Sequence, residues 1–232
     1  MNQPVVTKEN KDITNRLNVL RAGVLGANDG IVSIAGLVIG VASAAHDTMT
    51  VFVAGLAGLV AGALSMAGGE YTSVSTQRDT EEAAVRKEAD EIETDYEGEL
   101  QELADIYEKK GVSPRLAKEV AKELMDKDAL AAHTEAEFNI TLDEYVNPWS
   151  AALSSMFSFT CGAILPLLAI TLLPIPIRVV VTFFIVLLAL ALTGYVSAYL
   201  GGAPKQKAVM RNVIVGMLTM IVTYLVGHFI PL

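Results

Sequence analysis

Cysteine is nearly absent from this sequence of 232 residues: only Cys161 is present, and it lies within an apolar run. A single cysteine excludes an intrachain disulfide, and nothing indicates an oxidising compartment for the polar part of the chain. No GxxxxGKS phosphate loop, no GxGxxG turn after a strand and no serine, histidine and aspartate pattern of a hydrolase is present. A signal peptide is not expected, because the first apolar run starts after Arg21 and continues for more than about 20 residues.

Acidic residues outnumber basic residues, and their excess is confined to one part of the chain. Hydrophobic residues make up 52% of the chain and its mean hydropathy is +0.45, yet its formal net charge is −9. Between Tyr71 and Asn147 there are 21 acidic and 9 basic residues, a net charge of −12, whereas the rest of the chain carries +3. The sequence therefore predicts a membrane protein interrupted by one acidic module. The charge of this module argues against a nucleic-acid partner.

Long apolar runs predict five transmembrane helices. We expect them at residues 22–45, 50–69, 151–173, 177–200 and 208–230. Around them we expect four parts. These are a cytoplasmic N-terminal segment at 1–21, transmembrane helices 1 and 2 at 22–70, an acidic helical domain at 71–147 and transmembrane helices 3 to 5 at 148–232.

The basic residues outside the acidic module predict the orientation of the chain. Seven of these eight residues gather before the first span or around the start of the fifth: Lys8, Lys11, Arg16, Arg21, Lys205, Lys207 and Arg211. The eighth, Arg178, lies at the opposite side. Because cytoplasmic loops of membrane proteins are enriched in lysine and arginine, we expect the N-terminus and the acidic module to be cytoplasmic.

One carboxylate, Asp29, lies inside the first apolar run, in the motif GANDGIVS. An ionised side chain in hydrocarbon costs roughly 3 kcal/mol or more, so such a group normally faces a polar cavity, a proton path or an ion. Gly26 and Gly30 flank it and would let another helix or a cation approach the backbone. The alternative is a packed polar residue that is hydrogen-bonded across helices.

The second span supplies a possible partner for Asp29. Small residues repeat along it at helical spacing and predict close helix packing: Ala54, Gly58 and Gly62. Met66 follows one turn later, and the short preceding turn brings it to a depth similar to that of Asp29. A thioether beside a carboxylate suits a borderline-soft ion such as Fe²⁺, although methionine in a membrane helix more often serves only to pack the apolar core. Asn28 and Glu70 complete the candidate transport path.

The acidic module contains spaced carboxylates. They follow one stripe of a helix, provided that the helix continues through Gly98: Glu88, Glu91, Asp95, Glu99 and Glu102. Like charges at this spacing repel one another unless cations neutralise them, so the stripe predicts a divalent-metal site. A solvated acidic helix face is the alternative interpretation.

A later amphipathic helix, opening at Ser113 and Pro114 and ending near Phe138, adds His133 and Glu137 at i, i+4. This spacing lets both side chains bind one ion from a single helix face. Histidine favours transition metals, but the sequence does not rank Fe²⁺ against Mn²⁺, Co²⁺ or Zn²⁺.

Three segments give a further indication: GANDGIVS, LAGLVAGALSMAGGEYTSVSTQRD and NPWSAALSSMFSFTCGAILPLL. Together with their surroundings at 20–232 they resemble the vacuolar iron transporter family, which includes yeast calcium-cross-complementer-type and plant nodulin-like proteins. The resemblance implies a homodimer of all-α protomers with five transmembrane helices. It also implies a cytoplasmic three-helix metal-binding domain, built on an extension of the second span and inserted before the third. Such proteins export Fe²⁺, and often Mn²⁺, from the cytosol in exchange for protons.

The resemblance assigns roles to individual residues. Asp29 and Met66 match the intramembrane path, and five glutamates match the metal-binding domain: Glu88, Glu91, Glu99, Glu102 and Glu137. Plant members carry two methionines where this chain has His133 and Thr134. They also have carboxylates in place of Asn18 and Gly58.

The predicted function is thus a proton-coupled metal exporter, not an enzyme, with metal ions as bound and transported species and no prosthetic group. A prokaryotic plasma membrane is favoured over a vacuolar one. Two alternatives remain. A ferroxidase or iron store would need a Glu-x-x-His motif, which the sequence lacks. A metal sensor or buffer would bind metal without transporting it.

Overall fold

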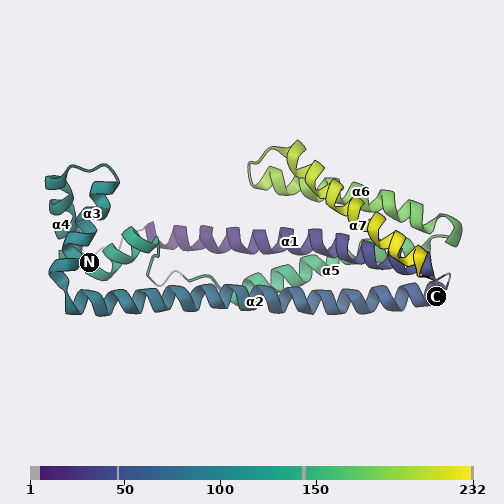
Figure 1. The fold of residues 1–232 in the computed structure, drawn as a ribbon, viewed down its shortest axis with the longest axis horizontal. Helices are drawn as coiled ribbons and strands as arrows, with labels where there is room; N and C mark the ends of the chain where they lie inside the picture. Colours follow the sequence, from purple (N-terminus) through teal and green to yellow (C-terminus); the bar gives the residue numbers. More distant parts are fainter. Residues whose placement is uncertain (1–5, 46, 143–144, 231–232) are drawn as a thin grey trace. The chain divides into compact units, whose positions relative to one another are not determined.

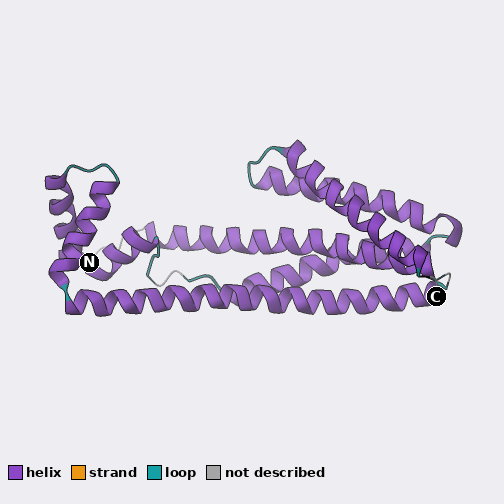
Figure 2. Ribbon diagram, viewed as in Figure 1, coloured by secondary structure: helices purple, strands orange, loops and turns teal. Residues whose placement is uncertain are grey.

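The structure, a computed structural model, describes residues 6–45, 47–142 and 145–230. Within these ranges it contains seven helices and no strands (Figures 1 and 2). The helices are α1 (Val6–Ala44), α2 (Thr48–Thr94), α3 (Tyr96–Lys109), α4 (Pro114–Phe138), α5 (Pro148–Leu172), α6 (Ile175–Leu200) and α7 (Lys205–Phe229).

Five of these helices are long and apolar enough to cross a membrane: α1 from Leu17 onward, α2, α5, α6 and α7. The five predicted spans are therefore confirmed. The polar lead-in to the first span is itself helical from Val6, while its first five residues lie outside the described ranges. The prediction that the second span continues without a break into polar sequence is also confirmed, because α2 is one helix of 47 residues.

The chain divides into two compact units. The membrane unit comprises Ile13–Thr72 and Asn147–Leu232, and it contains the apolar part of every candidate span. The acidic unit comprises Met1–Asp12 and Ser73–Val146. Only the part of α2 up to Thr72 thus belongs to the membrane unit.

Glycines bring α1 and α5 of the membrane unit into backbone contact. A Cβ atom added at Gly26 or Gly30 of α1 would collide with the backbone of Ser155 or Phe159 in α5. Small residues permit such close approach in lipid, where packing contacts drive helix association. Around this contact lies the apolar core of the unit, which includes Ile31, Ile34, Val38, Phe159 and Leu190.

The small residues of the second span also lie at helix contacts, as predicted. Gly58 faces the side chains of Ile34 and Leu37 in α1, and Gly62 faces the ring of Phe159 in α5. These glycines of α2 therefore accommodate side chains of two neighbouring helices, unlike Gly26 and Gly30 of α1, which lie against backbone.

The acidic unit has a small core between α3 and α4, which form a helical hairpin (Figure 1). Its buried residues are Leu103, Ala104, Ala121 and Met125. As predicted, α3 ends at Lys109 and is followed by Gly111, whose φ of +97° favours glycine. Helix α4 opens at Pro114 and ends at Phe138 as expected, although Ser113 makes no side-chain capping hydrogen bond. The expected continuous helix is interrupted at Asp128, whose φ of −164° and ψ of 93° are not helical and kink α4.

The contact between α1 and α5 predicts a stability effect. Gly30→Ala should lower the stability of the protein by about 1–3 kcal/mol, because the new methyl group forces two backbones apart. Gly69→Ala, at a position where a Cβ meets nothing within 4 Å, is the control and should be neutral or slightly stabilising. Thermal unfolding of both variants in detergent measures the difference. Equal midpoints would contradict the contact.

Candidate functional site

The acidic stripe does not lie on one continuous helix, because α2 ends at Thr94. Asp95 is the N-cap of α3, and its carboxylate accepts a hydrogen bond of 3.1 Å from the backbone N–H of Gly98. A capping aspartate satisfies an otherwise unpaired N–H group and so starts a new helix. The assumption of a continuous helix through Gly98 is therefore wrong, and Asp95 is a cap. The break places Glu88 on α2 and Glu99 on α3.

Three side chains from three helices converge in the acidic unit: Glu88 of α2, Glu99 of α3 and His133 of α4. Each offers one ligand atom, and these atoms all lie within 4.8 Å of one another. The Nδ1 atom of His133 lies 2.7 Å from Oε1 of Glu88 and 3.6 Å from Oε2 of Glu99. His133 and Glu88 are 0% and 1% exposed, and Glu99 is half-buried.

A backbone contact sets the orientation of the His133 ring. Its Nε2 atom lies 2.8 Å from the carbonyl oxygen of Glu99. Since a carbonyl can only accept, Nε2 carries a proton and donates it. Nδ1 is left facing the carboxylates, and neither it nor Oε1 of Glu88 makes a well-aligned hydrogen bond within the described part of the chain. Buried polar atoms are rarely left in this state, so a proton or a cation is needed between them.

Burial also shifts the protonation of the cluster. It raises the pKa of Glu88 to about 7, helped by the charges of Glu137, Glu99 and Glu91 and opposed by His133. Burial raises the pKa of Glu99 as well, and the charge of His133 again opposes it. Near neutral pH, Glu88 therefore divides between its protonated and ionised forms, and a bound cation would favour the ionised form.

The other predicted metal ligands lie outside this cluster. Glu91 pairs with Lys87, whose Nζ atom lies 2.7 Å from its carboxylate, while Glu102 and Glu137 are exposed. His133 is buried whereas Glu137 is exposed, and the joint binding of one ion by these two side chains stays a prediction. Thr134, next to His133, uses its hydroxyl to donate to the carbonyl of Leu130 at 2.8 Å.

In the membrane unit, Asp29 is half-buried and accepts a hydrogen bond of 2.6 Å from the hydroxyl of Ser33, one turn along α1. Met66 is half-buried and packs against the apolar core. Asn28 lines a cavity of this unit, and its Oδ1 atom is buried without a hydrogen-bond partner among the described residues.

Glu70 is 7% exposed and forms an ion pair with Arg21, which links α2 to α1. The guanidinium group of Arg21 also donates to Oδ1 of Asn18, at 3.0 and 3.2 Å. The sequence reasoning used Arg21 only for orientation and missed this pairing. The signal was present, because both residues lie at the same end of adjacent antiparallel spans.

These features define a multi-pass, all-helical membrane protein with a carboxylate in its first span and a buried cluster of carboxylates and imidazole in a polar unit. The sequence profile of the VIT family matches residues 20–228, so the chain belongs to this family, as predicted.

Two relatives illustrate the similarity. The chain is 42% identical over 209 residues to a "Vacuolar iron transporter" of Acanthamoeba castellanii. The match covers 90% of this chain and 77% of the relative. It is 34% identical over 229 residues to "Vacuolar iron transporter homolog 2.1" of Arabidopsis thaliana. This match covers 98% of this chain and 89% of the relative.

The cluster predicts metal binding that competes with protons. Because the pKa of Glu88 is raised to about 7, its ionised form is lost as the pH falls through neutrality. Co²⁺ affinity of the full-length protein, followed by absorption spectroscopy, should therefore fall at least about tenfold between pH 8 and pH 6. Glu88→Gln should bind Co²⁺ more weakly and with a shallower pH dependence.

The matched control for this measurement is Glu93→Gln, an exposed glutamate of the same helix. It should behave like the unmodified protein. Equal losses of affinity in both variants would mean that only the general acidity of the unit attracts the ion.

Proposed function

We propose that this protein exports divalent metal ions, Fe²⁺ foremost and Mn²⁺ as a second cargo, from the cytosol across a membrane in exchange for protons. One observation carries the proposal: Glu88, Glu99 and His133 converge in the acidic unit. There, Nδ1 of His133 and Oε1 of Glu88 make no well-aligned hydrogen bond within the described residues. Relatives of the chain are named vacuolar iron transporters, which supports iron as the cargo. On this proposal the protein is not an enzyme and uses no prosthetic group.

Metal capture would take place in the acidic unit. An imidazole nitrogen with two carboxylates suits transition metals better than Mg²⁺ or Ca²⁺, which prefer oxygen ligands alone. The exposed carboxylates of Glu102 and Glu137 and the half-buried one of Glu91 would raise the local concentration of cations. Residues 71–147 would then act as an inserted cytoplasmic metal-binding domain.

Passage through the membrane would use Asp29, with Asn28, Met66 and Glu70 as further groups of the path. A carboxylate is costly in an apolar medium unless its charge is compensated. A metal ion would compensate it during transport, and a proton would replace the ion after release. Alternate occupation of the same carboxylate by metal and proton would couple the two fluxes.

A homodimer is part of the proposal. Asp29 and Ser33 lie on a face of α1 that also carries Leu25 and Leu37, which are 47% and 37% exposed in a single chain. A polar pair on such a face of a membrane helix calls for a partner that shields it from lipid. A second copy of α1 would provide this shield and complete the path.

The proposed orientation places the N-terminus and the acidic unit in the cytoplasm, because basic residues gather at Arg21 and between Lys205 and Arg211. A prokaryotic plasma membrane is the proposed location.

Transport in proteoliposomes tests the path. Asp29→Asn removes the carboxylate that metal and proton would occupy in turn. Fe²⁺ flux driven by a pH gradient should therefore fall at least about a hundredfold, to background. Asp90→Asn, an exposed position on the polar part of α2, should transport normally. Intact flux in the Asp29→Asn variant would contradict coupling of the metal and proton fluxes at Asp29. Metal binding without flux in the unmodified protein would favour a metal buffer.

Crosslinking tests the dimer. In a Cys161→Ser background, Ser33→Cys should form a crosslinked dimer in membranes with a short bifunctional thiol reagent, because the two α1 helices would face each other. Leu188→Cys is the control, since its side chain is 74% exposed on α6. Crosslinking of Leu188→Cys alone would place the dimer contact on another face.

A further inference from the structure

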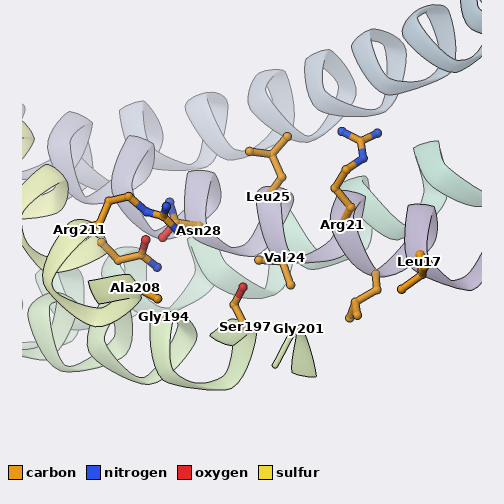
Figure 3. A pocket seen from close by; sticks show the side chains of 12 residues that line it. Leu17, Arg21, Val24, Leu25, Asn28, Gly194, Ser197, Gly201, Ala208 and Arg211 are labelled. Atoms are coloured by element: carbon orange, nitrogen blue, oxygen red, sulfur yellow. The ribbon is translucent and has the colours of Figure 1, made fainter. Parts of the chain in front are cut away.

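A cavity of about 420 Å³ lies between α1, α6 and α7 of the membrane unit (Figure 3). Besides Arg21, four side chains give it a polar region: Asn28 from α1, Ser197 from α6, and Arg211 and Asn212 from α7. In the view of Figure 3 the side chains of Arg211 and Asn28 overlap. All residues of this cavity belong to the membrane unit, whereas the metal cluster belongs to the acidic unit. The path proposed for the ion explains only one residue of the cavity, Asn28.

The charge of the cavity is positive. Arg211 forms no ion pair with any residue that the structure describes, and no carboxylate lines the cavity. Arg21 also lines it, but its guanidinium group is paired with Glu70. An unpaired guanidinium group that shares a cavity with amides and a hydroxyl offers hydrogen-bond donors to an anion.

The rest of the cavity wall is aliphatic. It is formed by Leu17, Leu20, Val24 and Leu25 of α1 and by Ala208 of α7. A ligand that fills this cavity must therefore be an anion at one end and apolar at the other. A free inorganic anion would leave the aliphatic wall uncovered, whereas a phospholipid has both parts.

A second observation places the cavity near the lipid headgroups. Lys205, at the start of α7, lies over the rings of Tyr195 and Tyr199 of α6, with 5.0 Å from Nζ to each ring centroid. Tyrosine and lysine side chains gather at the membrane surface. Ser197 of α6 and Arg211 of α7 lie within two turns of this group along their helices.

We propose that this cavity binds an anionic phospholipid, with Arg211 holding the phosphate group and Leu17 and Leu20 of α1 contacting an acyl chain. Arginine binds phosphate oxygens through two parallel hydrogen bonds, and basic pockets between membrane helices are known recognition sites for anionic headgroups. The proposal does not depend on metal transport.

Native mass spectrometry of the full-length protein tests this site. The protein is presented with equal amounts of phosphatidylglycerol and phosphatidylcholine that carry the same acyl chains. Phosphatidylglycerol should be retained in preference, and Arg211→Gln should reduce its retention about fivefold, towards that of phosphatidylcholine. Arg211→Lys, which keeps the charge, should retain an intermediate amount.

Two further variants make the test specific. Lys207→Gln removes a charge from the same end of α7, outside the cavity lining, and should retain phosphatidylglycerol normally. Ser197→Leu fills the cavity without changing its charge and should lose the lipid. This variant also serves if Arg211→Gln cannot be purified.

Several results would overturn the proposal. Equal retention of the two lipids, or an equal loss in Lys207→Gln and Arg211→Gln, would leave only general attraction to the basic end of the protein. Displacement of the lipid by equimolar glycerol 3-phosphate would identify a site for soluble phosphates. A partner chain that covers the cavity would exclude the lipid from the unmodified protein.

Discussion

A charge that leaves water must be compensated, and this constraint shapes both units of the protein. In the membrane unit, the buried carboxylate of Glu70 is paired with Arg21, and the buried guanidinium group of Arg178 donates to Thr48 and to the carbonyl of Ala45. In the acidic unit, Glu88 lies against His133. The first two groups are compensated by fixed partners, whereas the third needs a proton or an ion. This difference separates structural charges from the candidate metal site.

The apolar part of the fold was predictable from the sequence because hydrophobicity acts along each run separately. Five runs long enough to cross a bilayer became five helices, and the absence of a strong breaker after Gly69 allowed α2 to continue into polar sequence. The break before α3 was not predicted. There a local effect, the capping of Gly98 by Asp95, outweighs the helical spacing of the surrounding glutamates.

The candidate site could be predicted only in part. Spacing along one helix identified carboxylates and His133, but the approach of Glu88, Glu99 and His133 depends on how three helices fold together. For the same reason the sequence could not tell that Glu102 and Glu137 would remain exposed. The burial of His133 against the Glu99 carbonyl, which fixes the orientation of its ring, is likewise a tertiary property.

The backbone contact between α1 and α5 limits the motions available to the membrane unit. At Gly26 and Gly30 no side chain lies between the two backbones that could repack during a small shift. Packed helices usually slide past one another by adjusting such side chains. Without them, α1 and α5 would travel as one rigid body, so that any alternation in access to Asp29 would have to come from hinge or shear movements of the remaining helices around this pair.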